Sequence, residues 1–387
     1  MRKVRVSAGL LVPALALSVA ACGGSGESST AASTSLAPAS DAVKLAGVCP
    51  STVVMQYDWE PEAEHSAAYQ LVGPGYTIDG DKKRVTGPLV IDGMDTGVKI
   101  EIRAGGPAIG FQSVASQMYV DKGITLGAVT TDGAISASTS QPVTAVVSPL
   151  EKSPQMLMWD PATHPAWTGI SDIGKSDVKV VVSSGTVYSS LLEEKGLVRG
   201  SQFDTSYDGA PARFVASPDI VQQGFATAEP YIYQHEVSAW NKPVKYQLLA
   251  DVGYNVYPEA LSVRTSDAQT LAPCLKKLVP IIQKAQVDYL SNPGTANKLI
   301  VETVGKFNDS WTYSDGVADF AAKAMKDLGI VKNDTTGSVG GMDPARVQSA
   351  IDTFGPILSS SGAKVKGGLK ASDLATNEFI DPGVTLK

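Results

Sequence analysis

Apolar runs of strand length, each leading through a turn into a helical stretch, are the feature that most constrains this chain. Residues 52–57 form a β-branched run, and residues 98–103 alternate apolar and polar side chains with the period of a strand. Residues 179–182 are a third, continuous apolar run, and helical spacing dominates from Ala268 onward. This alternation predicts an α/β fold whose sheets are mostly parallel.

The length of the chain predicts two lobes, because about 340 residues exceed what one small core usually organises. We expect one lobe at residues 46–147 plus 254–387 and the other at residues 148–253. The chain would then cross between the lobes twice and leave a hinge there. A net charge of −7 without a basic arm or patch argues against a nucleic-acid partner.

The first residues indicate export. A basic start is followed by an apolar run at residues 8–20, which is too short to span a membrane. The run ends in small residues before Cys22, and this predicts a lipoprotein signal peptide at residues 1–21 with lipid on Cys22. The alternative is an ordinary secretory signal with an incidental cysteine. The Gly/Ser-rich residues 22–45 predict a flexible tether, and the chain is expected on the outer face of the cell membrane.

Two cysteines remain once Cys22 is set aside. Cys49 and Cys274 form an even pair in an oxidising compartment, so they are either a disulfide or two buried, unpaired thiols. The chain has no HExxH, CxxC, GxGxxG or GxSxG motif. We therefore assign no catalytic residue, no metal ligand and no cofactor, and an enzyme is the less supported class.

Candidate ligand contacts lie where strands lead into helices, because open parallel sheets bind ligands beyond the carboxyl ends of their strands. Trp59 offers a face for stacking, and His65 and Tyr69 share one helix face. Ser184 and Thr186 open a helix whose N–H groups suit a polar tail. The expected ligand-binding residues are Asp58, Trp59, His65, Tyr69, Gly106, Ser184, Thr186, Tyr188 and Glu229.

Each of these residues also has a purely structural interpretation. Trp59 and Tyr69 could pack in the core, and His65 could hydrogen bond to a neighbouring acid. Ser184 and Thr186 could only cap their helix. Glu229 precedes a proline, where it could accept hydrogen bonds from a ligand or pair with a nearby base.

Two segments resemble the NMT1/THI5-like family. Residues 58–69 read Asp-Trp-Glu-Pro and then His65 and Tyr69 on the next helix, as in the opening of that family. Residues 221–231 resemble its Gly-aromatic pair followed by Glu-Pro, and Gly105-Gly106-Pro107 is a looser match. The resemblance implies a two-lobed, type II periplasmic-binding-protein-like fold with a ligand cleft between the lobes.

The same resemblance implies an extracytoplasmic solute-binding lipoprotein of an ABC importer. Its ligand would be a small heterocycle such as a thiamine-precursor pyrimidine, and its partner an ABC permease, with the chain acting as a monomer. The alternatives are a sulfonate- or nitrate-type anion-binding protein and an extracytoplasmic enzyme of pyrimidine metabolism. Two departures stand out: residues 76–97 are unusually turn-rich, and the cysteine motif of the eukaryotic pyrimidine synthases is absent.

Overall fold

The structure, a computed structural model, describes residues 36–207, 209–309 and 311–387. The predicted signal peptide and the predicted lipid attachment at Cys22 lie outside these described residues. Within them, no helix combines the length and apolar character needed to cross a membrane. The predicted tether, residues 22–45, is wrong at its described end. There, Ala37–Pro38 pairs with a sheet strand, and Leu45 is buried and donates its N–H to the Thr96 carbonyl.

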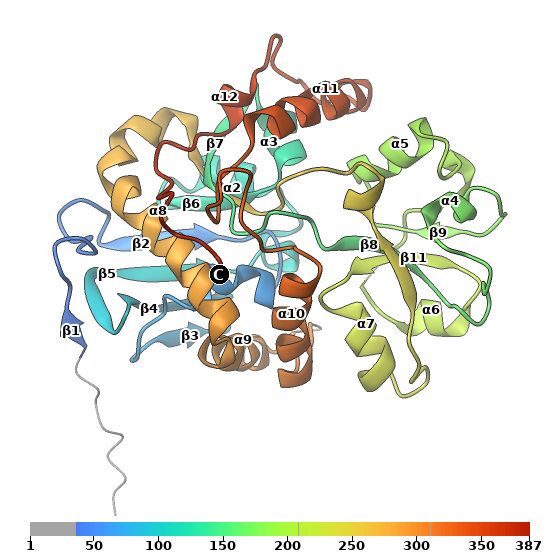
Figure 1. Cartoon of the computed structure of the whole chain (residues 1–387), viewed down its shortest axis with the longest axis horizontal. Coiled ribbons are helices and arrows are strands. Elements are labelled where there is room, and N and C mark those ends of the chain that lie inside the picture. The colour runs from blue at the N-terminus through green and yellow to red at the C-terminus, as the bar shows by residue number, and fades with distance from the viewer. Residues whose placement is uncertain (1–35, 208, 310) are drawn as a thin grey trace, which may run out of the picture. The chain divides into compact units, whose positions relative to one another are not determined.

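The larger sheet is built mainly from the first part of the chain (Figure 1). Its strands are β1 (Ala37–Pro38), β2 (Thr52–Gln56), β3 (Thr77–Asp79), β4 (Arg84–Ile91), β5 (Met94–Arg103), β6 (Leu126–Val129), β7 (Val143–Val147) and β13 (Ala260–Arg264). Their order is β3-β4-β5-β2-β6-β13-β7, with β1 beside β5. β2 is parallel to β5 and β6, whereas β13 is antiparallel to β6 and β7.

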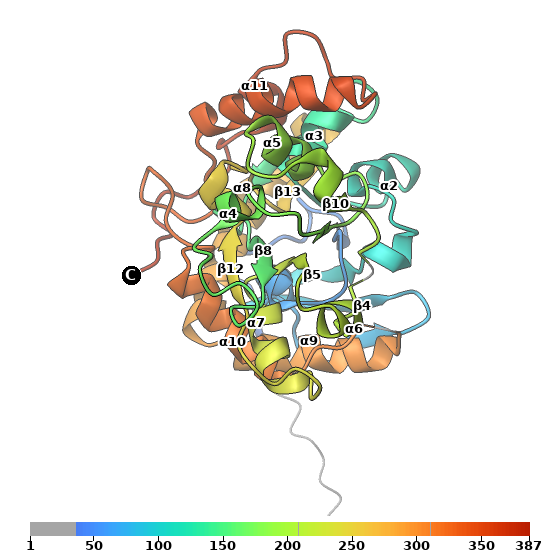
Figure 2. The ribbon, with the colours of Figure 1, turned by 90° about the vertical axis from the view of Figure 1, so that its right-hand side faces the viewer.

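β2 is covered on both faces, which explains its unbroken apolar run. Because successive strand side chains point to opposite faces, Val53 and Met55 enter one core and Val54 enters another. The helices beside this sheet are α1 (Ser66–Tyr69), α2 (Val114–Val120), α3 (Thr131–Ala137), α8 (Ala268–Ser291), α9 (Gly294–Phe307), α10 (Asp315–Asp327), α11 (Pro344–Ser360) and α12 (Ala371–Leu374). The first core includes side chains of α8, α9 and α10, and the second those of α2, α3 and α11. Figure 2 shows α11 beside α3.

The smaller sheet is mixed. Its strands are β8 (Gln155–Trp159), β9 (Val180–Val181), β10 (Phe203–Asp204), β11 (Val221–Phe225) and β12 (Lys245–Leu248). The order is β10-β9-β11-β8-β12, with β9 parallel to both neighbours and β8 antiparallel to both. Its helices are α4 (Ile170–Ile173), α5 (Val187–Glu194), α6 (Ala212–Ala216) and α7 (Glu229–Tyr231), which continues as a π-helical turn at Ile232–Glu236.

The α/β class with two sheets is confirmed, but the sheets are less parallel than the sequence suggests. The turn-rich residues 76–97 form the antiparallel β3–β4–β5 meander rather than a loop. Asp92 and Gly93 both adopt positive φ in the turn between β4 and β5, which suits the tight hairpin there. The larger sheet draws on residues 37–147 and 260–264 and the smaller on 155–248. The lobe boundaries themselves stay a prediction.

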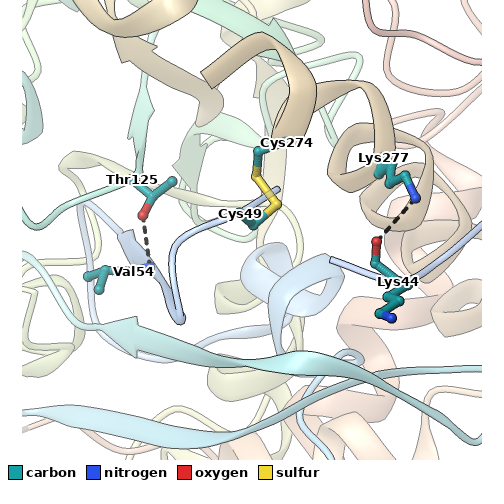
Figure 3. The surroundings of a disulfide bond; sticks show 6 residues. All are labelled: Lys44, Cys49, Val54, Thr125, Cys274 and Lys277. Atoms are coloured by element: carbon teal, nitrogen blue, oxygen red, sulfur yellow. Dashed lines mark hydrogen bonds between the residues drawn. A yellow bond between two sulfur atoms is a disulfide. The ribbon is translucent and has the colours of Figure 1, made fainter. Parts of the chain in front are cut away.

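A disulfide joins Cys49, which precedes β2, to Cys274 in α8 (Figure 3). The bond closes a loop with a sequence separation of 225 residues. Lys277, one turn further along α8, donates to the Lys44 carbonyl on the same incoming segment. The chain entering β2 is therefore fastened to the helix that covers the sheet, which fixes the start of the strand whose other end carries the candidate site.

Candidate functional site

The candidate site begins where β2 ends. Two glycines that follow β5 are hydrogen bonded to this turn. Gly106 donates its N–H to the Asp58 carbonyl and Gly105 donates its N–H to the Trp59 carbonyl, both at 2.8 Å. Gly106 has φ +53°, and a Cβ there would lie 2.7 Å from Cε3 of Trp59. Only glycine fits without moving the tryptophan, so Gly106 lies under the Trp59 ring and supports its position.

Three aromatic rings gather beside this turn. The Trp59 ring centroid lies 6.2 Å from that of Phe111 and 6.0 Å from that of Trp311, which meets it edge-on. Trp311 also donates its indole N–H to the Pro61 carbonyl at 3.2 Å. Phe111 is 71 % exposed and has φ +57°, which is unusual for an aromatic residue. The group offers partly exposed ring faces for a flat ligand.

His65 is the centre of a group of acids. Its side chain is 1 % exposed, and its ring packs on Tyr57 with centroids 4.0 Å apart. Its Nε2 atom lies 3.5 Å from Glu259 Oε2, 3.9 Å from Glu62 Oε1 and 4.0 Å from Asp58 Oδ1. Burial lowers the pKa of His65 to about 3, so the imidazole is neutral at physiological pH.

The acids around His65 form a group that we call the acidic cluster: Glu62, Glu64 and Glu259 are buried, and Asp58 and Glu229 are partly exposed. Burial raises the pKa of Asp58 to about 6 and that of Glu229 to about 7. It also raises the pKa values of the other three carboxyls, and for Glu62 repulsion by Glu64 adds to the effect. Among the described residues, no lysine or arginine makes an ion pair with any member. A concentration of acids without basic partners is costly for folding and therefore points to function.

The acidic cluster draws on residues of both sheets. The Thr227 hydroxyl, in the turn after β11, donates a hydrogen bond to Glu64 next to α1. Glu229, at the start of α7, accepts the Phe225 N–H on Oε2 at 2.7 Å. Repulsion from Glu64 contributes to the raised pKa of Glu229. Of the residues predicted from the sequence, the structure therefore brings together Asp58, Trp59, His65, Gly106 and Glu229.

Tyr69 is buried in the core beside the site, where burial and then the charge of Glu60 raise the pKa of its hydroxyl. The other predicted residues lie elsewhere. Tyr188 is buried too and donates its hydroxyl to Gln223 Oε1 at 2.5 Å. The Thr186 hydroxyl is hydrogen bonded to that of Ser189, and Ser184 is exposed. No hydrogen bond or ion pair within the described part of the chain joins these residues to the acidic cluster. Their role in binding stays a prediction.

Sequence reasoning missed Glu259, Phe111 and Trp311. Glu259 directly precedes β13 and has φ +50°, a strained conformation for a non-glycine residue. Its side chain is buried although it is ionisable. The sequence carries one signal for Glu259: it is an acid placed between a proline and an apolar strand. Nothing in the sequence, however, indicates that β13 places it opposite His65.

Comparisons with known proteins bear on the fold. No family model matches the chain, and neither does any curated protein. Among solved structures, the periplasmic aliphatic sulphonate binding protein of Escherichia coli aligns with a TM-score of 0.52 at 12 % identity, over 81 % of this chain and 88 % of that one. A putative sulfonate-binding protein from Methylobacillus flagellatus gives 0.51 at 11 % identity, over 85 % and 92 %.

An ABC transporter structure from Parabacteroides distasonis gives a TM-score of 0.50 at 9 % identity, over 85 % of this chain and all of that one. At such low identity these similarities concern the fold alone. Membership of the NMT1/THI5-like family stays a prediction. This chain has the two-lobed α/β fold of periplasmic solute-binding proteins.

Proposed function

We propose that this chain is the extracytoplasmic solute-binding protein of an ABC importer. Its ligand would be a flat nitrogen heterocycle that carries amino or ring N–H donors or a positive charge. The observation that carries the proposal is the acidic cluster beside the Trp59 group, at the carboxyl end of a central parallel strand. In open sheets of this kind, ligands bind at that end.

The charge of the site selects the ligand class. Buried carboxylates without basic partners are stabilised by hydrogen-bond donors or cations brought by a ligand. The partly exposed rings of Trp59, Phe111 and Trp311 add stacking and cation–π attraction. An aminopyrimidine of the thiamine-precursor type supplies both features, a flat ring and donor groups.

A sulfonate or nitrate suits this site poorly. Such anions are normally met by arginine, lysine or several convergent N–H groups. The Escherichia coli protein of similar fold is named for sulphonates, but here the carboxylates of the acidic cluster would repel that ligand. The start of α5, with Ser184 and Thr186, is where an anion would be better accommodated.

Delivery to a membrane importer completes the proposal. Lipid on Cys22 would hold the chain at the outer face of the membrane, where a monomer can present both lobes to a permease. The role is capture rather than chemistry, so a bound ligand should be recovered unchanged. An enzyme of pyrimidine metabolism would instead release an altered product.

A thermal-shift screen of the full chain against aminopyrimidines, flavins, sulfonates and nitrate tests this assignment. A ligand that binds only the folded state stabilises it by about 2.7 kcal/mol at a hundredfold excess over Kd. We expect a shift with a donor-bearing heterocycle that Trp59→Ala abolishes. Trp167→Ala is the matched control, because Trp167 is also half-buried but stacks on His164 instead. A shift with sulfonate or nitrate alone would refute the ligand class.

A further inference from the structure

Three possible metal-ligand atoms, two from the acidic cluster and one from His65, converge without being bonded to one another. They are Asp58 Oδ1, His65 Nε2 and Glu259 Oε2, which all lie within 4.8 Å of each other. Each is buried and makes no hydrogen bond within the described part of the chain. Buried polar atoms in folded proteins nearly always have partners, so three convergent orphans are an anomaly that needs a cause.

His65 is the decisive member of the three. Its side chain is 99 % buried, and its free nitrogen faces carboxylate oxygens rather than a carbonyl or water-filled surface. A buried neutral imidazole with an unpartnered Nε2 is a ready metal ligand. The acids alone would not indicate a site, but this nitrogen aimed into them does.

The spacing of the atoms suits an ion at their centre. Zinc binds nitrogen and oxygen at about 2.0–2.2 Å, so two ligands on a tetrahedron lie roughly 3.3–3.6 Å apart. The His65 to Glu259 distance is 3.5 Å and the His65 to Asp58 distance is 4.0 Å. Both exceed ordinary hydrogen-bond lengths, yet small side-chain adjustments would bring all three atoms into a first coordination shell.

The donor set indicates the kind of ion. One imidazole with carboxylates is typical of divalent first-row metals such as zinc and manganese, whereas magnesium and calcium favour oxygen alone. Two carboxylates neutralise the charge of a divalent ion. Glu62 Oε1, 3.9 Å from the same nitrogen, is placed as a further ligand or a charge neighbour.

Access and backbone geometry agree with a binding role. The Asp58 side chain is 38 % exposed, so an ion can enter from its side and keep an open coordination position there. Glu259 is held at φ +50°, an unfavourable conformation that points its carboxylate at His65. Strained residues of this kind cluster at functional sites.

We propose that Asp58, His65 and Glu259 bind a divalent first-row metal ion, with zinc as the reference ion. The site goes beyond the solute-binding function, because the ion binds without any organic ligand. Its open position faces the exposed edge of Asp58, next to Trp59. A ligand captured there would meet the metal as well as the aromatic group.

Calorimetric titration of zinc and manganese into the full chain, first stripped with a chelator, tests the site. We expect one ion per chain, with magnesium binding at least a hundredfold more weakly than zinc. Glu259→Gln and Asp58→Asn should each weaken zinc binding at least tenfold. Asp132→Asn is the matched control, because Asp132 is a buried acid outside the acidic cluster that accepts the Tyr254 hydroxyl; it should change the affinity less than threefold.

Cobalt absorption by the wild-type chain tests the site without relying on any variant. Cobalt added to the stripped wild-type chain should give visible d–d absorption of a low-coordinate site, which zinc displaces. His65→Gln should remove this absorption, while His164→Ala, which alters a histidine stacked on Trp167, should keep it. Absence of zinc binding by the wild type, or binding that survives both Glu259→Gln and Asp58→Asn, would overturn the site. Neither result depends on whether the heterocycle binds, so the two proposals fail separately.

Discussion

Two strand-to-helix turns of this molecule carry predicted ligand contacts, and they differ in structure. The turn after β2 and the turn after β9 each follow a strand that is parallel to both neighbours. After β9, the polar groups satisfy one another: Gln223 accepts the Ser183 N–H and donates to the Ser183 hydroxyl. After β2, buried carboxylates and a histidine remain unpaired.

The difference shows how a structural turn is told from a functional one. Both turns carry residues that can bind a ligand, so residue type alone does not separate them. Satisfied polar groups stabilise the fold and leave little to offer a ligand. Unsatisfied buried groups destabilise the free protein, and this cost is offset only when a ligand or ion arrives.

The largest expected contrast concerns two glycines: Gly106, which follows β5 and packs on the turn after β2, and Gly185 in the turn after β9. Gly106→Ala should lower the free energy of unfolding by about 3 kcal/mol, because its Cβ would strain a positive φ and displace Trp59. Gly185→Ala, at φ +75° with open space around it, should cost only about 1 kcal/mol. Urea unfolding of the two variants measures both values. Equal losses would mean that Trp59 does not depend on Gly106.

Substitutions in the two turns should also differ in their effect on ligand affinity. Trp59→Ala should weaken binding of a donor-bearing heterocycle at least tenfold, about 1.4 kcal/mol or more, because it removes the stacking face. Thr186→Ala should change the affinity less than twofold, since its hydroxyl already bonds to Ser189. Equilibrium titration of both variants gives the comparison. A larger effect at Thr186 would move the binding site to the start of α5.

A stabilising substitution is expected only in the turn after β2. Glu62→Gln should raise the free energy of unfolding of the metal-free protein by about 1 kcal/mol at pH 8, because burial and the neighbouring acids raise the pKa of Glu62 in the folded state and so favour unfolding at high pH. Ser184→Ala, at an exposed position, should change it by less than about 0.5 kcal/mol. Thermal unfolding at pH 8 tests the pair. A destabilised Glu62→Gln would show that this carboxylate has a structural partner.

The last expected effect concerns pH. The pKa of Glu229 is raised to about 7, mainly by burial, with Glu64 and Glu62 as the acids that face it. The folded state therefore holds a proton that the unfolded chain releases near pH 4.5. The contribution of this group to the free energy of unfolding is complete below pH 4.5 and is lost as the pH rises to about 7. Glu229→Gln should flatten the fall in stability across that window, and an unchanged slope would contradict the assignment.

The sequence predicts much of the fold, because local patterns decide it. The apolar run of β2 and the helical spacing after Ala268 are both confirmed. A strand buried on two faces leaves a continuous apolar run, whereas a helix buried on one face leaves apolar residues three or four positions apart. The predicted end of the tether at residue 45 was wrong, because Leu45 packs into the core although it follows a Gly/Ser-rich stretch. The pairing of Cys49 with Cys274 was left open, because spacing alone does not show that two cysteines meet.

The site could be predicted only where it is contiguous. Asp58, Trp59 and His65 share one short segment, so their proximity follows from the chain itself. Glu259 and Trp311 reach the same place through β13 and the segment before α10. Their position depends on strand order and helix packing, which no local pattern encodes. The unpaired state of the acids is likewise a property of the assembled fold.

The most direct test of the central claim is calorimetric titration of an aminopyrimidine and a sulfonate into the wild-type chain and into Trp59→Ala. The account predicts that the aminopyrimidine binds the wild type, that Trp59→Ala weakens it at least tenfold, and that the sulfonate gives no heat. Binding of the sulfonate alone, unaffected by Trp59→Ala, would contradict the account and place the ligand away from the acidic cluster.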